Sequence, residues 1–211
     1  FSSSEFIAAR PSEEYTFCVL CTPVGPYYSG AVAVKIETEY SRATTGGIGF
    51  TKAAGNYGGA FYPTAQAIKE GYNQVIWTDH KEHKYIEESG TMNLMLVLGD
   101  KLVTPPLTDR ILAGITRNSI IELTKSWGWE VEERPISVAE IVEHAKNGTL
   151  KEAFGVGTAA VVSPINRIGF HGEDFAIPTP EDGKGMEIKA GLNKIRMGSV
   201  EDKFNWMVHV K

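Results

Sequence analysis

A glycine-rich stretch, Thr44–Gly59, constrains the backbone of this chain more than any other segment. Its sequence, TTGGIGFTKAAGNYGG, holds six glycines and a single lysine, Lys52. Glycine permits positive φ angles and a close approach of the backbone to another group, at an entropic cost. Composition alone therefore favours a tight structural turn with a solvated lysine. The competing interpretation is catalytic, because a lysine in a confined, partly desolvated site becomes an amine nucleophile.

Two familiar phosphate-binding motifs do not fit this stretch. A Walker loop requires serine or threonine directly after its lysine, whereas Lys52 precedes Ala53. A dinucleotide fingerprint requires a third glycine at a fixed spacing, and the segment Gly47–Gly49 (GIG) lacks it. Neither nucleotide motif therefore explains the glycines.

Composition and charge exclude several classes of protein. The 211 residues are 42% hydrophobic and 22% charged, which suffices to bury a full core as one domain or as a compact pair of layers. A net charge of −5 without a basic run argues against a nucleic-acid-binding groove. The apolar runs have strand length, well short of the roughly 20 residues of a spanning helix, and no signal peptide is evident. We therefore expect a cytoplasmic chain that binds neither nucleic acid nor membrane.

Cys18 and Cys21 form a C-x-x-C pair. The segment Tyr15–Val24 (YTFCVLCTPV) is expected to be a buried strand, on which positions three apart point to opposite faces. The thiols are therefore expected to be buried packing residues in a reducing cytoplasm, and neither a redox pair nor half a zinc site. His80 and His83, in DHKEH, have the chemistry to bind a metal, but such charged loops are usually solvated, so no metal site is expected.

The remaining sequence alternates between expected strands and helices without strict βαβ order. Strands are expected at Thr16–Leu20, Val32–Glu37, Gln74–Trp77, Asn93–Leu98 and Glu130–Glu133, and as a pair at Val156–Pro164 and Arg167–Ala176. Helices are expected from Thr64 to before Gly71, over Arg117–Trp127, from the capping box Ser137–Glu140 to Asn147, and over Lys184–Met197. This order predicts an α/β or α+β fold with a mixed sheet.

Five short motifs resemble, in order, those of one enzyme family. They are Lys52–Gly58 (KAAGNYG), Glu88–Asn93 (ESGTMN), Thr104–Leu107 (TPPL), Gly114–Arg117 (GITR) and Phe154–Ala159 (FGVGTA). From about Pro11 to its end, the chain resembles the large, C-terminal domain of branched-chain aminotransferases, which are class IV aminotransferases and pyridoxal-phosphate enzymes of fold type IV. The resemblance implies a mixed sheet that forms a pseudo-barrel with surrounding helices. It also favours the catalytic interpretation of Lys52.

The resemblance implies pyridoxal 5'-phosphate as cofactor and gives three residues a role at its ring. Lys52 is implied to hold the cofactor covalently and then to move a proton as a base. Glu88 is implied to face the pyridine nitrogen, and the neighbouring Glu87 is not, because successive residues of an extended backbone project oppositely. Tyr57 is implied to hydrogen-bond the phenolic oxygen, although a tyrosine in GNYGG would otherwise be a packing residue.

The same resemblance gives five further residues a role toward anions. Ile115, Thr116 and Thr158 are implied to bind the phosphate, and the backbone at a helix start suits an anion. Thr91 and Ala159 are implied to receive the substrate carboxylate, Ala159 through its backbone N–H. Residues of these types are otherwise strand-packing residues.

The resemblance covers only part of the family's architecture. We expect residues 1–14 to be a segment left from a missing small domain, and residues 15–211 to be the cofactor-binding domain. Without that small domain the phosphate-binding arginine and the side-chain pocket are missing, so the chain alone is expected to bind cofactor weakly and to self-associate through an exposed apolar face. A homodimer is expected for the full-length parent. Ala160 and Ser163 occupy the positions of the mammalian C-x-x-C pair, so no thiol switch is expected there.

Three functions remain open from the sequence. The favoured one is transamination of Leu, Ile or Val with 2-oxoglutarate as the amino acceptor. The second is another reaction on the same scaffold, as in D-amino-acid transaminases or aminodeoxychorismate lyases. The third is a folded but inactive fragment, suggested by the start at Phe1 inside a family domain.

Overall fold

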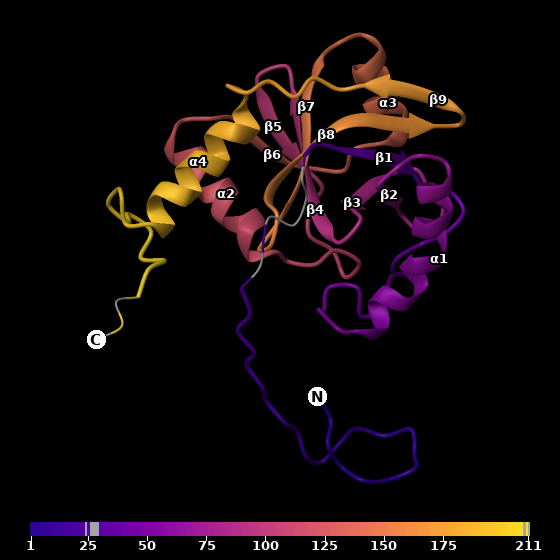
Figure 1. The fold of residues 1–211 in the computed structure, drawn as a ribbon. Helices are drawn as coiled ribbons and strands as arrows, with labels where there is room; N and C mark the ends of the chain where they lie inside the picture. Colours follow the sequence, from indigo (N-terminus) through magenta and orange to yellow (C-terminus); the bar gives the residue numbers. More distant parts are fainter. Residues whose placement is uncertain (24, 26–29, 209, 211) are drawn as a thin grey trace.

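The computed structural model describes residues 1–23, 25, 30–208 and 210, in which strands and four helices form one mixed α/β body (Figure 1). The strands are β1 (Val32–Ile36), β2 (Gln74–Thr78), β3 (Ile86–Ser89), β4 (Met92–Leu98), β5 (Lys101–Thr104), β6 (Val131–Glu133), β7 (Leu150–Gly157), β8 (Val161–Phe170) and β9 (Glu173–Ala176). The helices are α1 (Gly55–Lys69), α2 (Ile115–Ser126), α3 (Val138–Lys146) and α4 (Lys184–Arg196).

The strands form a ring with two extensions. Strands β3, β2, β1, β8, β7 and β4 are hydrogen-bonded in that order, and a further pairing of β3 with β4 closes the ring. Strand β1 is parallel to β2 and β8, whereas the other pairs of the ring are antiparallel. Strands β5 and β6 extend the sheet from β4, and β9 pairs with β8. The predicted mixed sheet in a pseudo-barrel is thus confirmed.

Strand β4 shows how the core forms on both sides of the sheet. All of its residues are buried, and its side chains alternate between two apolar clusters, as the period of a strand requires. Leu94 and Leu96 pack with residues of β1 and β8, and Met95 and Val97 pack against α2 and α4. In Figure 1 these two helices lie side by side, while α1 covers a different side of the barrel next to β2.

Seven predicted elements are confirmed with small shifts at their ends. They are strands β1, β2, β4 and β6 and helices α2, α3 and α4. The predicted cap of α3 is present, because the Ser137 side chain accepts a hydrogen bond from the Glu140 N–H at 3.0 Å. Gly148, just past its end, has a φ of 75°, which glycine adopts without strain. Local capping signals therefore predicted this helix well.

The predicted start of the first helix was wrong. Helix α1 begins at Gly55, inside the glycine-rich stretch, and not after Thr64. It continues through Pro63, and Pro63 and Ala67 are buried. Glycine and proline both weaken an isolated helix, so the sequence favoured a later start. Packing against β2 overrides that preference.

The two strands predicted near the C-terminus had wrong boundaries. Val156–Pro164 spans the turn between β7 and β8, where Val156 pairs with Val162. Arg167–Ala176 spans the turn between β8 and β9, and its end residues pair with each other. Strands β3 and β5 were not predicted at all. The two glutamates of β3 disfavoured a strand assignment, because Glu is depleted in strands.

The predicted buried strand at Tyr15–Val24 was also wrong. Val24 itself lies outside the described residues, and residues 16–23 form no strand. Cys18 and Cys21 are both exposed, so they are not packing cysteines. Figure 1 shows the first residues as an extended arm that leaves the body of the molecule. Apolar patterning predicted burial of this segment, but the barrel, as far as the structure describes it, does not cover the arm.

Candidate functional site

One cavity of about 700 Å³ brings together all of the residues to which the family resemblance gives a role at the cofactor or the substrate. Lys52, Tyr57, Glu88, Thr91, Ile115, Thr116, Thr158 and Ala159 all line it. They lie up to about a hundred residues apart in the sequence, so the fold assembles them. Asn93 and Val156 complete the floor of the cavity.

A row of paired residues across the sheet explains this convergence. Glu88 on β3 is paired with Asn93 on β4, and Asn93 is paired with Val156 on β7. Thr91 lies in the turn between β3 and β4, and Thr158 and Ala159 lie in the turn between β7 and β8. The two turns therefore meet at the end of the barrel that carries the row. The first residues of α1 and α2 close the cavity from the sides.

Glu88 is the buried charged group of the cavity, with 3% of its surface exposed. Its Oε2 lies 3.0 Å from the Nε of Arg42. Its Oε1 accepts hydrogen bonds from the Leu112 N–H at 2.9 Å and from the Asn93 amide at 3.2 Å. Burial raises the pKa of Glu88 to about 7, although Arg42 and the Leu112 N–H oppose that rise. Glu88 therefore titrates close to neutral pH.

Lys52 belongs to a loop whose backbone is held by hydrogen bonds and by close packing. The Asn56 side chain donates hydrogen bonds to the carbonyls of Ile48 (2.8 Å) and Thr51 (2.7 Å). A Cβ on Gly49 would lie 2.9 Å from the Cα of Arg110, so this position requires glycine. Lys52 itself is exposed and forms no ion pair with any residue that the structure describes. The cavity is therefore open to water on the lysine side.

The start of α2 brings backbone N–H groups to the cavity, and no side chain among the described residues caps them. Its N-cap residue, Gly114, provides no capping side chain, and the first turn carries no acidic residue. A Cβ on Gly114 would overlap the side-chain oxygen of Asn93, so glycine lets this helix start approach the strand row. Free N–H groups and the helix dipole favour an anion at this position. Thr116 is buried there, and Ile115 is 81% exposed.

Sequence reasoning missed three polar residues around the cavity. Arg42 binds Glu88, and Arg110 binds Glu87 with its Nε 2.6 Å from Oε1. Asn93 lies within the motif ESGTMN and was identifiable from the sequence, but neither arginine belongs to any motif. Only the tertiary structure reveals them.

The remaining sequence candidates lie away from the cavity. His83 contacts the Thr78 hydroxyl through Nδ1 at 2.7 Å. Across residues 1–23, 25, 30–208 and 210, no group of three or more His, Cys, Asp or Glu side chains is arranged to hold a metal. None of the helices that the structure describes has the length and apolarity needed to cross a membrane.

The chain matches a known family over most of its length. The sequence model described as amino-transferase class IV matches residues 3–168. A probable branched-chain-amino-acid aminotransferase of Staphylococcus epidermidis is 40% identical over 215 aligned residues, covering 100% of this chain and 60% of that protein. The branched-chain-amino-acid transaminase 1 of Bacillus subtilis is 40% identical, covering 97% and 59%. The chain thus spans about 60% of the length of these curated relatives.

Solved structures share the fold. A branched-chain aminotransferase from Thermoproteus uzoniensis, determined with norvaline, has a TM-score of 0.74 at 26% identity and covers 89% of this chain and 59% of that one. The branched-chain amino acid aminotransferase from Escherichia coli has a TM-score of 0.67 at 30% identity, with 83% and 56% covered. The barrel and its helices are therefore arranged as in these aminotransferases.

Proposed function

The chain belongs to the class IV aminotransferases, and we propose that it is the cofactor-binding part of a branched-chain-amino-acid transaminase. Leu, Ile or Val would donate the amino group and 2-oxoglutarate would accept it, with pyridoxal 5'-phosphate as the cofactor. The convergence of Lys52, Tyr57, Glu88 and the start of α2 on one cavity carries the proposal. The 40% identity to enzymes named for this activity supports the substrate class.

The residues of the cavity fit pyridoxal phosphate in three respects. A primary amine, Lys52, is available to an aldehyde because no described residue pairs with it. A buried carboxylate, Glu88, suits a protonated ring nitrogen. The uncapped start of α2, with Thr116 beside it and Thr158 across the cavity, suits a phosphate. These groups surround one volume of about 700 Å³, which is ample for the cofactor and a small amino acid.

Each residue has a role that its chemistry allows. When bound, pyridoxal phosphate supplies the electron sink that makes the Cα proton of an amino acid removable. With the cofactor in place, the Lys52 amine would accept that proton at Nζ and return it to another carbon. Ionised Glu88 would keep a proton on the pyridine nitrogen of the cofactor, and the Tyr57 hydroxyl would hydrogen-bond the cofactor's phenolic oxygen. Thr91 and the Ala159 N–H are assigned to the substrate carboxylate.

We infer that the site is completed by protein outside this chain. Thr91, Thr158 and Ala159 are exposed, so the substrate side of the cavity is open. The curated relatives are longer by about 40% of their own length, which leaves room for the small domain that would cover it. In this proposal residues 1–14 link the two domains, residues 15–211 form the cofactor-binding domain, and the parent enzyme is a cytoplasmic homodimer.

Borohydride trapping tests the role of Lys52. After incubation with pyridoxal phosphate and reduction, we expect the cofactor to be fixed on the peptide that contains Lys52, and Lys52→Ala to abolish that label. Lys69→Ala, a change at an exposed lysine of α1, is the matched control and should leave the label unchanged. Peptide mass spectrometry reads out the site. Label on another lysine, or undiminished label in Lys52→Ala, would contradict the proposal.

The reaction itself requires the full-length parent. We expect it to transaminate L-Leu in preference to D-Ala, with 2-oxoglutarate as the acceptor. A preference for D-Ala would indicate a D-amino-acid transaminase on the same scaffold, and the substrate assignment would then be wrong even if Lys52 holds the cofactor.

A further inference from the structure

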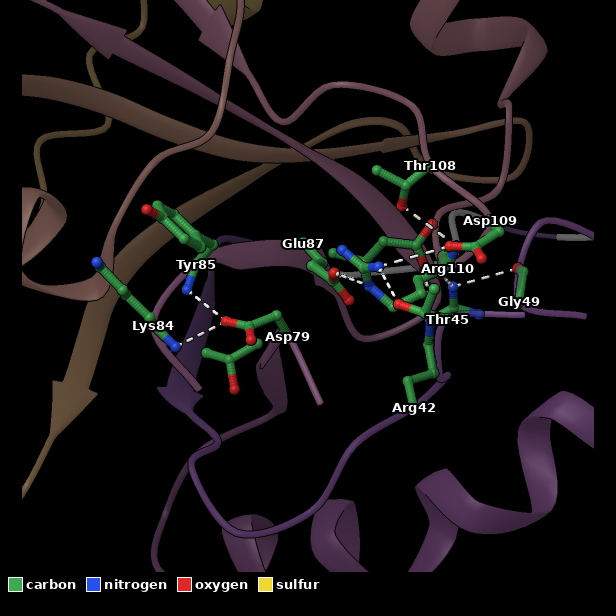
Figure 2. A network of polar contacts seen from close by, with 12 residues as sticks. Arg42, Thr45, Gly49, Asp79, Lys84, Tyr85, Glu87, Thr108, Asp109 and Arg110 are labelled. Carbon is green, nitrogen blue, oxygen red and sulfur yellow. Dashed lines mark hydrogen bonds and ion pairs between the residues drawn. The ribbon is translucent and has the colours of Figure 1, made fainter. Parts of the chain in front are cut away.

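Two consecutive glutamates on β3 are both buried, and each binds its own arginine. Glu88 lines the cavity and pairs with Arg42, whereas Glu87 does not line it and pairs with Arg110. Figure 2 shows Glu87, which belongs to β3, close to Arg110 and Arg42. Burying two adjacent carboxylates carries a desolvation cost, so the second pair needs an explanation.

Each of the two arginines hydrogen-bonds the chain segment to which the other belongs. Arg42 donates through Nη2 to the carbonyl oxygens of Arg110 and of Gly49, the latter at 3.3 Å. Arg110 donates through Nη1 to the hydroxyl of Thr45 at 2.8 Å. Each guanidinium therefore binds the segment that carries the other one. Residues 42–49 run into the glycine-rich stretch and precede Lys52, which lines the cavity.

The Arg110 segment is fixed at several further points. The Asp109 carboxylate accepts a hydrogen bond from the Gly46 N–H at 2.6 Å, and its carbonyl accepts one from the Phe50 N–H at 3.0 Å. The Leu112 N–H then reaches Glu88. The contact between Arg42 and Glu88 is thus built on a backbone whose own anchor is the ion pair of Arg110 with Glu87.

We propose that Arg110 and Glu87 are positioning residues that hold the Arg42 guanidinium against the Glu88 carboxylate. Neither residue touches the cavity, so neither acts on a bound group directly. Among the residues that the structure describes, the charges that act most on Glu88 are those of Arg42, Glu87 and Lys52. Those that act most on Glu87 are Arg110, Asp79 and Arg42. Arg42 is paired with Glu88 at 3.0 Å, so its placement sets how strongly its charge opposes the rise in the pKa of Glu88 that burial causes.

The consequence for catalysis rests on the proposed function. If the Glu88 carboxylate pairs with the ring nitrogen, loss of the Arg110 anchor also reduces the ionisation of Glu88 and so weakens that pairing. The effect on Glu88 itself exists without any cofactor. The two levels can therefore be tested separately.

The test is a titration of the Glu88 carboxyl in the cofactor-free protein by carbon-13 NMR. Its resonance is assigned by its loss in Glu88→Gln. Arg110→Lys keeps the positive charge but loses the planar fork that reaches both Glu87 and Thr45. We expect this variant to raise the titration midpoint of Glu88 by about one pH unit, a tenfold change in proton affinity. Arg134→Lys is the matched control, because Arg134 also binds two carboxylates, those of Glu132 and Glu140, away from the cavity.

The outcomes separate positioning from general stability. An unchanged midpoint in a folded Arg110→Lys protein, or an equal rise in Arg134→Lys, would overturn the proposal. If Arg110→Lys does not fold, Thr45→Val removes the hydroxyl acceptor of Arg110 Nη1 and leaves its longer contact with Asp109 at 3.5 Å, so a smaller rise is expected. An unchanged midpoint in Thr45→Val would overturn the proposal as well. The pH dependence of the absorbance of bound pyridoxal phosphate provides the second readout. A shift of Glu88 without a shift of that absorbance would retain the positioning role and reject the proposed role of Glu88.

Discussion

Glu88 combines burial with partners that only partly compensate its charge. Three donors reach its two oxygens, yet burial still raises its pKa to about 7. A carboxyl whose pKa is raised by folding binds its proton more tightly in the folded state than in the unfolded state. Ionising Glu88 therefore opposes folding, which is a cost that a structural residue would not retain. This conflict between stability and charge is typical of functional sites.

The conflict predicts a pH dependence of stability. Between pH 4.5 and about 7 the folded state binds more protons at Glu88 than the unfolded state, so the free energy of unfolding should fall as pH rises through this window. The contribution of this group is about 3 kcal/mol at most. In Glu88→Gln, which does not ionise, this part of the fall should be absent. Urea denaturation of the cofactor-free protein from pH 4.5 to 8 measures it.

The control for this prediction is Glu122→Gln, an equal change of charge at an exposed position of α2. It should keep the pH dependence of the wild-type protein. The same decline in Glu88→Gln and in the wild type would show that Glu88 is not the group responsible.

Helix α4 shows how a strand residue can start a distant helix. The N-cap residue, Gly183, has no side chain to offer. Instead, Glu152 on β7 accepts hydrogen bonds from the N–H groups of Lys184 at 2.6 Å and Gly185 at 2.9 Å. A Cβ on Gly183 would lie 2.7 Å from a Glu152 oxygen, so glycine admits the carboxylate. Negative charge at a helix start is stabilising, and here it also joins α4 to the barrel.

Replacing this carboxylate should loosen α4. Glu152→Gln keeps the shape but replaces one acceptor oxygen with a donor, so we expect a loss of about 2 kcal/mol in the free energy of unfolding. Glu143→Gln, at an exposed position of α3, should change it by less than about 0.5 kcal/mol. Urea denaturation at neutral pH compares the two. Equal effects would mean that Glu152 does not act as a cap.

The N-terminal arm exposes apolar residues that a stable monomer would cover. Phe17 is 91% exposed and Leu20 is 85% exposed. Figure 1 shows that the arm projects from the barrel and touches little of it. The arm pairs mainly with itself: a bridge joins Ser2 and Tyr15, and the Ser3 N–H donates to the Glu14 carbonyl at 3.0 Å. Exposed apolar segments of this kind mark an interface with another polypeptide.

We therefore expect this chain to self-associate on its own. The double change Phe17→Ser and Leu20→Ser should shift the distribution toward monomer, because it removes the apolar surface of the arm. Met197→Ser, at a residue that is 82% exposed beyond α4, is the control and should leave the association unchanged. Sedimentation velocity at increasing concentration measures the change. A monomeric wild type, or an equal effect of Met197→Ser, would show that the arm is not the cause.

Local signals and motif spacing determined much of this protein. Apolar alternation predicted β1, β2 and β4, and the cap at Ser137 predicted α3, because these patterns act within a few residues. Four of the five motifs contain residues that line the cavity, whereas no residue of the fifth, Thr104–Leu107, lines it. The family could therefore be read from the sequence, and the role of Lys52 stays a prediction.

The tertiary structure decided what depends on contacts between distant segments. Two glutamates on β3 are compatible with a buried strand only because Arg42 and Arg110 reach them from other loops. Helix α1 runs through glycine and proline because β2 supports it. The exposure of Cys18 and Phe17 follows from the absence of a surface for the arm to pack on within this chain. Burial depends on how distant segments are arranged. For that reason the sequence predicted local elements and the family better than it predicted which side chains are covered.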